Sequence, residues 1–461
     1  MRSNVFIHVQ RTFACVAFVV LLLLGSVSPA SAERAELVKA VDVEPVWTAH
    51  RVGFALLTHG DQQFVGYYDA QRRMTIAQRE LGTSQWTYQK LDRVTGWDSH
   101  NYITMAVDVD EQLHVTGDMH NDPLFYLRTT KPLDITTLEQ VPNMVGPERE
   151  HCVTYPRFIQ GPSGELIFRY RDGGSGRGDD YYNVYHPDMQ VWTRLVDEPL
   201  ITGKGVKSAY ATSPTLGPDG YFHMTWVWRD TSDASTNHHL SYARSRDLRN
   251  WTTAAGAPLK LPITFESCEV VDPVPSGGGM INGNTRLGFD HHDRVIISYH
   301  KYDQDGNTQI YNARFEDDAW KIYQTSDWDY RWEFGGGGSI PFRVRIGNVR
   351  PVGNGHLVLR YNYPGGSGRW LLDEKTLRPI PGRTGPPPTA PLPRALTRVT
   401  SDFPGMNIVR ANDLGSVPDP RTRYLLTWEA LGPNRDHPRG GDLPAPVMLR
   451  LIELQDPAGA R

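Results

Sequence analysis

The chain has 461 residues, with 48 Lys and Arg against 52 Asp and Glu, and a formal net charge of −4 at pH 7. A nucleic-acid-binding protein would show a basic domain or stripe, which this charge balance does not provide. We therefore expect no nucleic-acid partner. An anionic ligand would have to be attracted by local arginines, because the overall field does not favour it.

The first 32 residues have the features of a cleavable secretory signal. Arg2 and Arg11 flank the start of an apolar run at residues 13–24, and Ala30-Ser31-Ala32 has the small-x-small form of a signal-peptidase site. The apolar run is shorter than the roughly 20 residues that span a bilayer. We expect residues 1–32 to be removed, leaving a secreted or periplasmic protein with no membrane partner.

Seven strand-like runs recur through the rest of the chain, without helical periodicity of useful length. They begin at Gln63, Leu113, Glu165, Tyr221, Arg294, His356 and Tyr424. Repeats of this kind indicate a β-propeller. The sequence thus predicts an all-β, seven-bladed β-propeller of four-stranded antiparallel blades, formed by residues 33–461 as a single catalytic domain. We expect residues 447–454 to pair with residues 54–57 and close the ring.

Polar residues with catalytic potential gather in the first half of the chain, at the ends of strand-like segments. They are His100, His120, Tyr155 and Arg171. The innermost strands of a propeller converge on its axis, so side chains at their ends can meet in one funnel. A lone histidine is more often structural than catalytic, but two of them in neighbouring polar segments make the functional reading as strong as the structural one.

These side chains suit β-elimination on a uronic acid, in which the C5 proton is removed and the C4 oxygen leaves. Arg171 can neutralise the adjacent carboxylate through a two-pronged hydrogen bond. A histidine or tyrosine takes the proton, and the same or another group protonates the leaving oxygen. Tyrosine is a poor base at neutral pH unless a cation lowers its pKa, which Arg171 could do for Tyr155. Asn121, Arg229, Tyr302 and Arg360 are the further candidates for substrate binding.

Residues 99–102, 117–122, 154–157, 168–174 and 299–303 together resemble the BNR-repeat-containing family of seven-bladed propellers that includes ulvan lyases. The resemblance implies that His100 and His120 are the paired active-site histidines and Tyr155 the catalytic tyrosine. It implies that Arg171 neutralises the carboxylate and that Arg229 is a second substrate-binding arginine. Within this set we expect His100 to act as base and Tyr155 as proton donor.

The resemblance also implies a structural zinc ion held by histidine and cysteine. Several histidines and Cys268 occur in the middle of the chain, although no pair has a diagnostic ligand spacing. We place His238, Cys268 and His300 first as ligands, with a buried, unliganded Cys268 as the alternative. No organic cofactor is expected.

The leading hypothesis is a monomeric lyase acting on an anionic polysaccharide of the sulfated, uronate-containing, ulvan-like kind. The first alternative is a propeller glycoside hydrolase, either sialidase-like or an exo-acting rhamnosidase, which would normally need a pair of carboxylic acids. The second alternative is a carbohydrate-binding propeller without catalytic activity, whose aromatic residues stack on sugars.

Overall fold

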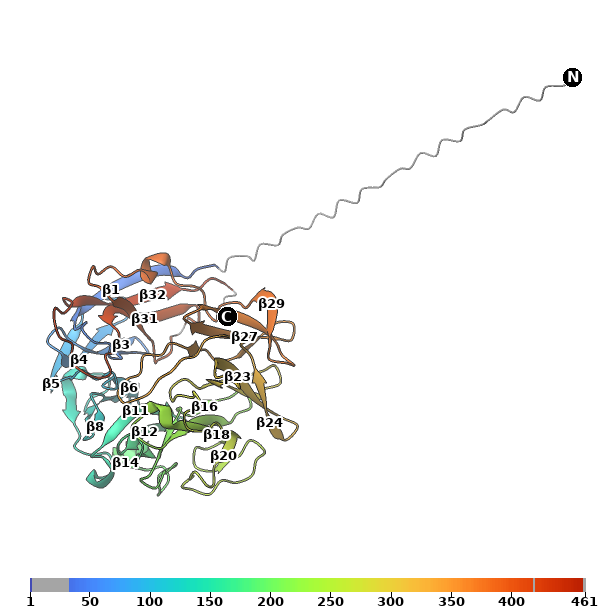
Figure 1. The fold of residues 1–461 in the computed structure, drawn as a ribbon. Helices are drawn as coiled ribbons and strands as arrows, with labels where there is room; N and C mark the ends of the chain where they lie inside the picture. The colour runs from blue at the N-terminus through green and yellow to red at the C-terminus, as the bar shows by residue number, and fades with distance from the viewer. Residues whose placement is uncertain (2–32, 418, 459–461) are drawn as a thin grey trace.

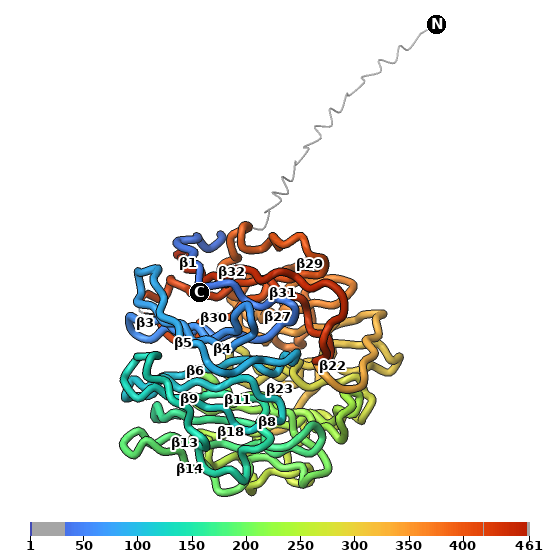
Figure 2. The backbone as a smooth tube through the Cα atoms, turned by 90° about the vertical axis from the view of Figure 1, so that its left-hand side faces the viewer, coloured from blue at the N-terminus to red at the C-terminus, as the bar shows by residue number. Residues whose placement is uncertain are grey.

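The structure is a computed structural model that describes Met1, residues 33–417 and residues 419–458. Seven antiparallel sheets follow one another around a ring, each built around a run of four strands (Figures 1 and 2). The fold is a seven-bladed β-propeller, as the repeats predict. The predicted signal peptide lies outside the described residues except for Met1. Within those residues, no helix has the length and apolar character needed to cross a membrane.

The third sheet carries His120, Tyr155 and Arg171, and His100 lies in the connection between the first two sheets. The first contains β2 (Ala55–His59), β3 (Gln62–Tyr68), β4 (Arg73–Glu80) and β5 (Thr87–Val94). The second contains β6 (Thr104–Val107), β7 (Leu113–Thr116), β9 (Tyr126–Thr129) and β10 (Leu138–Gln140). The third contains β8 (His120–Asp122), β11 (Val153–Gln160), β12 (Leu166–Asp172), β13 (Asp179–His186) and β14 (Val191–Arg194).

The next three sheets complete most of the ring. The fourth contains β15 (Ser208–Ala211), β16 (Thr215–Leu216), β17 (Phe222–Arg229), β18 (Asn237–Ser245), β19 (Trp251–Thr252) and β20 (Glu269–Asp272). The fifth contains β21 (Arg286–Phe289), β22 (Val295–Tyr302), β23 (Thr308–Glu316) and β24 (Ala319–Gln324). The sixth contains β25 (Arg345–Ile346), β26 (Arg350–Val352), β27 (His356–Tyr363), β28 (Gly366–Asp373) and β29 (Pro379–Thr384).

The seventh sheet joins the two ends of the chain. It contains β30 (Met406–Asn412), β31 (Thr422–Leu431), β32 (Val447–Gln455) and β1 (Glu36–Val46). β1 pairs with β32 from Glu36 opposite Gln455 to Val46 opposite Val447. The predicted pairing of residues 447–454 with residues 54–57 is therefore wrong, because the latter lie in β2 and pair with β3. The earlier strand β1 takes the outer position in the last blade, and its pairing covers the edge of β32.

Each predicted repeat forms the second strand of a different sheet, namely β3, β7, β12, β17, β22, β27 and β31. These strands are flanked on both sides, which explains why the sequence marks them so clearly. In β17 all eight residues are buried, among them Trp226 and Trp228. Short 3-10 helices (η) connect some strands: η1 (Ile135–Thr137), η2 (Pro147–Arg149), η3 (Pro187–Met189), η4 (Ala234–Thr236) and η5 (Arg394–Thr397).

Candidate active site

A cavity of about 500 Å³ opens where connections from all seven blades meet. It is lined by Arg51, Gly53, Ser99, His100, His120, Tyr155, Arg171, Ser175, Tyr210, Arg229, Ser232, Ile281, Asn282, Gly283, Gly337, Gly338, Ser339, Ile340, Pro341, Phe342, Arg345 and Pro433. The lining includes four arginines and two histidines, but no Asp or Glu. The predicted catalytic residues His100, His120, Tyr155 and Arg171 therefore share one cavity.

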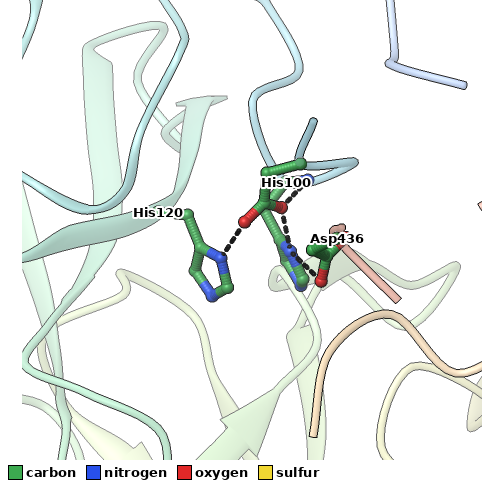
Figure 3. A group of neighbouring side chains, drawn as sticks. His100, His120 and Asp436 are labelled. Atoms are coloured by element: carbon green, nitrogen blue, oxygen red, sulfur yellow. Dashed lines mark hydrogen bonds and ion pairs between the residues drawn. The ribbon is translucent and has the colours of Figure 1, made fainter. Parts of the chain in front are cut away.

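One carboxylate, that of Asp98, holds both histidines. The Nδ1 atom of His100 lies 2.6 Å from Oδ1 of Asp98, and the Nδ1 atom of His120 lies 2.5 Å from Oδ2. Figure 3 shows His100 and His120 side by side, with Asp436 beyond His100. The two imidazole rings stack with their centroids 3.9 Å apart. The Asp98 carboxylate therefore fixes the orientation of both imidazole rings.

Local turn chemistry places these groups. Oδ1 of Asp98 also accepts a hydrogen bond from the backbone N–H of His100 at 2.8 Å, a turn typical of Asp. Asp118, just before β8, and Asn121, within β8, adopt positive φ values of 59° and 64°. Asp and Asn tolerate this left-handed conformation better than most residues. His120 lies between them and pairs with Thr154 of β11.

The hydrogen bonds from the two histidines change the pKa of Asp98. Burial of Asp98 favours its neutral form, but the bonds from His100 and His120 outweigh burial and hold the pKa of this carboxyl well below its usual range. Asp98 is thus ionised and accepts Nδ1–H from each ring. Neither Nε2 atom has a hydrogen-bond partner among the described residues. An imidazole held through Nδ1 by a carboxylate can exchange a proton at Nε2, as in catalytic triads.

Tyr155 lies against this pair on a bulge of β11. The β11–β12 register shifts between Thr154 and Arg157, and Tyr155 has φ of 60°. Such a conformation is strained for an aromatic residue, and bulges often redirect side chains at functional sites. The Tyr155 ring meets the His100 ring edge-on, with centroids 5.5 Å apart.

Burial raises the pKa of the Tyr155 phenol, and the neighbouring Tyr210 raises it further. Arg171 and Arg229 lower it by less. Arg171 does lower this pKa, as expected, but the effect of burial is larger and the pKa is raised overall. Tyr155 carries its proton at neutral pH, which suits a donor.

Arg171 is 3% exposed, yet its hydrogen-bond partners within the part of the chain that the structure describes are neutral: Asn121, Thr154 and Tyr210. Its Nη2 atom donates to Oδ1 of Asn121 and to Oγ1 of Thr154, both at 3.1 Å. Its Nε atom has no partner among the described residues. The guanidinium carbon lies 4.9 Å from the centroid of the Tyr155 ring. Asn121 thus orients Arg171, and the cation keeps its charge available for a ligand.

Arg229 is 7% exposed and lies at the end of β17. It donates to the backbone carbonyls of Thr231, Ser232 and Asp233. Its guanidinium carbon is 5.3 Å from the Tyr210 ring centroid. Arg229 is therefore a second cavity arginine whose hydrogen-bond acceptors are all neutral.

Three of the four predicted substrate-binding residues do not line the cavity: Asn121, which contacts the cavity residue Arg171, and Tyr302 and Arg360. The Tyr302 hydroxyl donates to the Trp332 carbonyl at 2.8 Å, and Arg331 lies over the Tyr302 ring. Arg360 is an exposed residue of β27. The structure gives neither Tyr302 nor Arg360 a place in this cavity.

The predicted zinc ligands are not brought together. His238 contacts Asp230 through Nε2 and His239 through Nδ1, at 3.0 and 2.7 Å. The Cys268 thiol contacts the Phe265 carbonyl at 3.3 Å. His300 is 1% exposed, and neither ring nitrogen has a partner among the described residues. This donor set does not fit a zinc ion, and Cys268 is a partly buried thiol outside any disulfide among the described residues.

A different set could hold a metal ion. Across residues 33–417 and 419–458, one group of at least three His, Cys, Asp or Glu side chains has ligand atoms within 4.8 Å of one another: Asp98, His100, His120 and Asp436. Two imidazoles and two carboxylates are plausible ligands for a transition metal. An ion would replace the Nδ1–H bonds to Asp98 or bind beside them.

Asp436 is a site residue that sequence reasoning missed. It accepts hydrogen bonds from the backbone N–H and hydroxyl of Ser339 at 2.7 and 2.8 Å, and from the N–H of Ser99 at 3.3 Å. One oxygen lies 3.7 Å from Nδ1 of His100. Asp436 thus joins the loop that carries His100 to the loop at residues 337–342. The two partners are 337 and 97 residues away, so no local pattern could reveal them.

The fold and the cavity define the class: a seven-bladed β-propeller with a polar site where its blades meet. A family model described as "BNR repeat-containing family member" matches residues 62–328, more than half of the chain, and the chain belongs to this family. The resemblance found in the sequence is thereby confirmed.

Solved structures of two lyases share the fold. The polysaccharide lyase Uly1 aligns with a TM-score of 0.59 and 12% identity, over 91% of this chain and 99% of its own. An ulvan lyase of polysaccharide lyase family PL25 aligns with a TM-score of 0.58 and 14% identity, over 86% of this chain and 94% of its own. At such low identity the likeness establishes the architecture alone.

A short stretch is more similar in sequence to a curated relative. The short isoform of an ulvan lyase from Alteromonas sp. (strain LOR) is 36% identical over 62 residues. That stretch is 13% of this chain, and it spans only 12% of the relative's length.

Proposed function

We propose that the protein is a polysaccharide lyase that cleaves a uronic-acid-containing polymer by β-elimination. The observation that carries the proposal is one cavity lined by His100, His120, Tyr155 and Arg171, with no acid in its lining. It is supported by the lyase folds of similar architecture, one of which is described as bound to -[GlcA(1-4)Rha3S]-. We extend the proposal to a sulfated, ulvan-like substrate and to secretion through the predicted signal peptide.

The chemistry assigns one role to each group. Arg171 binds the uronate carboxylate and stabilises the charge that develops on it when C5 loses its proton. Nε2 of His100 takes that proton, because Nδ1 is held by Asp98. The electrons of the broken C5–H bond form the C4–C5 double bond, and the C4–O bond breaks.

Tyr155 then supplies the proton to the leaving oxygen. Its raised pKa keeps the phenol protonated until this step. The His100 imidazolium then loses its proton and the phenolate regains one, directly or through water, which restores both groups. His120, on the same carboxylate, is placed to position the sugar or to share the proton.

The hydrolase alternative lacks a suitable acid pair. A glycoside hydrolase needs one carboxyl group that remains protonated as a general acid. The pKa of Asp98 is shifted the opposite way, and both its oxygens are held by histidines. Asp436 is held by Ser99 and Ser339. These acids orient other groups and do not face the cavity as a catalytic pair.

The products distinguish the three candidate functions. A lyase yields an unsaturated uronate that absorbs in the ultraviolet, a hydrolase yields reducing ends without that absorbance, and a binding module yields neither. Incubating the protein with a panel of uronate polymers, and measuring both signals in the same samples, tests the proposal directly.

A further inference from the structure

Besides Arg171 and Arg229, two further arginines line the cavity. Arg51 lies in the connection between β1 and β2, and Arg345 begins β25. Both line the cavity, together with residues 281–283 and 340–342. They come from segments other than those that carry Tyr155 and Arg171. The cavity therefore has a second group of cations.

These two arginines lack compensating charge. Among the described residues no Asp or Glu oxygen lies within 4.0 Å of either guanidinium group, and no side-chain hydrogen bond is formed by either. Blade arginines differ: Arg93 bonds to Asp118 at 2.6 Å, and Arg169 bonds to Asp180 at 2.9 Å. Both side chains are exposed to solvent, and both line the same concave site, where one ligand could contact them together.

A third arginine adds positive charge near Arg51 and Arg345. Arg286 donates to the carbonyls of Gly283 and Thr285, so it supports the 281–283 wall of the cavity. Burial and the neighbouring Arg345 lower the pKa of Arg286, and the same two causes lower the pKa of Arg51. Like charges are thus held close together, and a bound anion would relieve their repulsion.

We propose that Arg51 and Arg345 form a second anion subsite, which binds an acidic substituent on a sugar next to the one held by Arg171. The guanidinium groups recognise oxyanions through forked hydrogen bonds. Two sources share this chemistry, a sulfate ester and the carboxylate of another uronate. The inference rests on the proposed function, because it names a further part of the same substrate.

The test compares binding and turnover in matched variants. The Arg51→Gln, Arg345→Gln double variant removes two charges from the subsite. The control is Arg383→Gln, which removes an exposed cation of β29 that does not line the cavity. Dissociation constants are measured by calorimetry, with ulvan as the sulfated uronate polymer and with the same polymer after chemical desulfation. All proteins also carry His100→Ala to prevent turnover.

We expect the double variant to bind the sulfated polymer about tenfold more weakly, since charge-assisted bonds are lost. Its affinity should also fall less steeply with salt. The control should match the parent. If sulfate is the ligand, desulfation removes the difference between parent and double variant; if a second carboxylate is the ligand, the difference persists. Equal affinity of parent and double variant for both polymers would overturn the subsite.

Turnover separates this inference from the proposed function. With the catalytic histidine restored, the double variant should show a higher KM and a kcat close to that of the wild type. A wild-type protein that releases no unsaturated product contradicts the lyase proposal. The calorimetric comparison still decides the subsite in that case, because it requires no reaction.

Discussion

The molecule has two histidine-rich regions, and they differ in the groups that contact their imidazole rings. In the first, His100 and His120 bond to the two oxygens of one carboxylate and line a cavity. In the second, His238 bonds to Asp230 and His239, while His300 is enclosed by aromatic rings such as Trp332. Burial lowers the pKa of His238 and of His300. The candidate catalytic region is distinguished by a carboxylate that both rings share and by Nε2 atoms without a partner among the described residues. The number of histidines does not distinguish the two regions.

The largest expected effect comes from the first region. His100→Ala should reduce the release of unsaturated product by roughly a hundredfold to ten-thousandfold, because the base is lost. Tyr155→Phe should have an effect of similar size, because the donor is lost. Initial rates of ultraviolet absorbance give the measurement. Near-ultraviolet circular dichroism should show both variants folded, and wild-type turnover in either would remove that residue from the mechanism.

The second region supplies the matched control for that experiment. His238→Gln keeps a hydrogen-bonding side chain at a position away from the cavity. We expect its turnover to stay within a few-fold of the wild type. A loss as large as that of His100→Ala would show that the two regions do not differ in the way the geometry indicates.

Removing the shared carboxylate should have the next largest effect. In Asp98→Asn the amide cannot accept Nδ1–H from both rings, so we expect kcat to fall by about a hundredfold or more. The pKa of Asp98 is held below its ordinary value of 3.8, so its carboxylate stabilises the fold above that pH. The gap in Tm between wild type and Asp98→Asn should be widest above pH 4 and shrink as the pH falls below 3.8.

A gap in Tm that stays constant from neutral pH down to the acid-denaturation range would contradict the role given to Asp98. Asp42 offers a control, since its carboxylate is exposed and pairs with Arg450 on the outside of the ring. Exposed ion pairs contribute little to stability. Asp42→Asn should therefore leave both kcat and Tm almost unchanged.

The smallest effect on activity is expected at His300. Burial lowers the pKa of His300 to about 4, from an ordinary 6.5. The neutral ring is therefore favoured in the fold, and stability is full above pH 6.5 and falls as the pH drops toward 4. The shift of the His300 pKa from 6.5 to about 4 corresponds to roughly 3 kcal/mol of unfolding free energy. His300→Leu should keep wild-type turnover. Its free energy of unfolding should decrease less than that of the wild type as the pH falls, because it has no imidazole to protonate at this position.

Urea unfolding at pH 7 and pH 4.5 measures the effect. The wild type should lose more free energy of unfolding between the two conditions than His300→Leu. Identical losses in the two proteins would show that His300 is not protonated on unfolding in the way its burial implies.

The blade count could be predicted from sequence because the second strand of most blades is largely buried, as in β17 and β22, although β27 is buried only at its start. The ring closure could not, because Glu36–Val46 is mostly exposed or half-buried and its partner is at the other end of the chain. His100 and His120 could be found through their local polar segments. Arg51 and Arg345 reach the cavity, and Asp436 reaches His100, only through the closure of the ring, so their local sequence gives no sign of it.

The most direct test of the central claim is the ultraviolet absorbance of unsaturated uronate, recorded together with reducing ends during incubation with a sulfated uronate polymer. The account predicts that the two signals rise in parallel in the wild type and that both disappear in His100→Ala. Reducing ends that accumulate without absorbance would contradict elimination and favour hydrolysis.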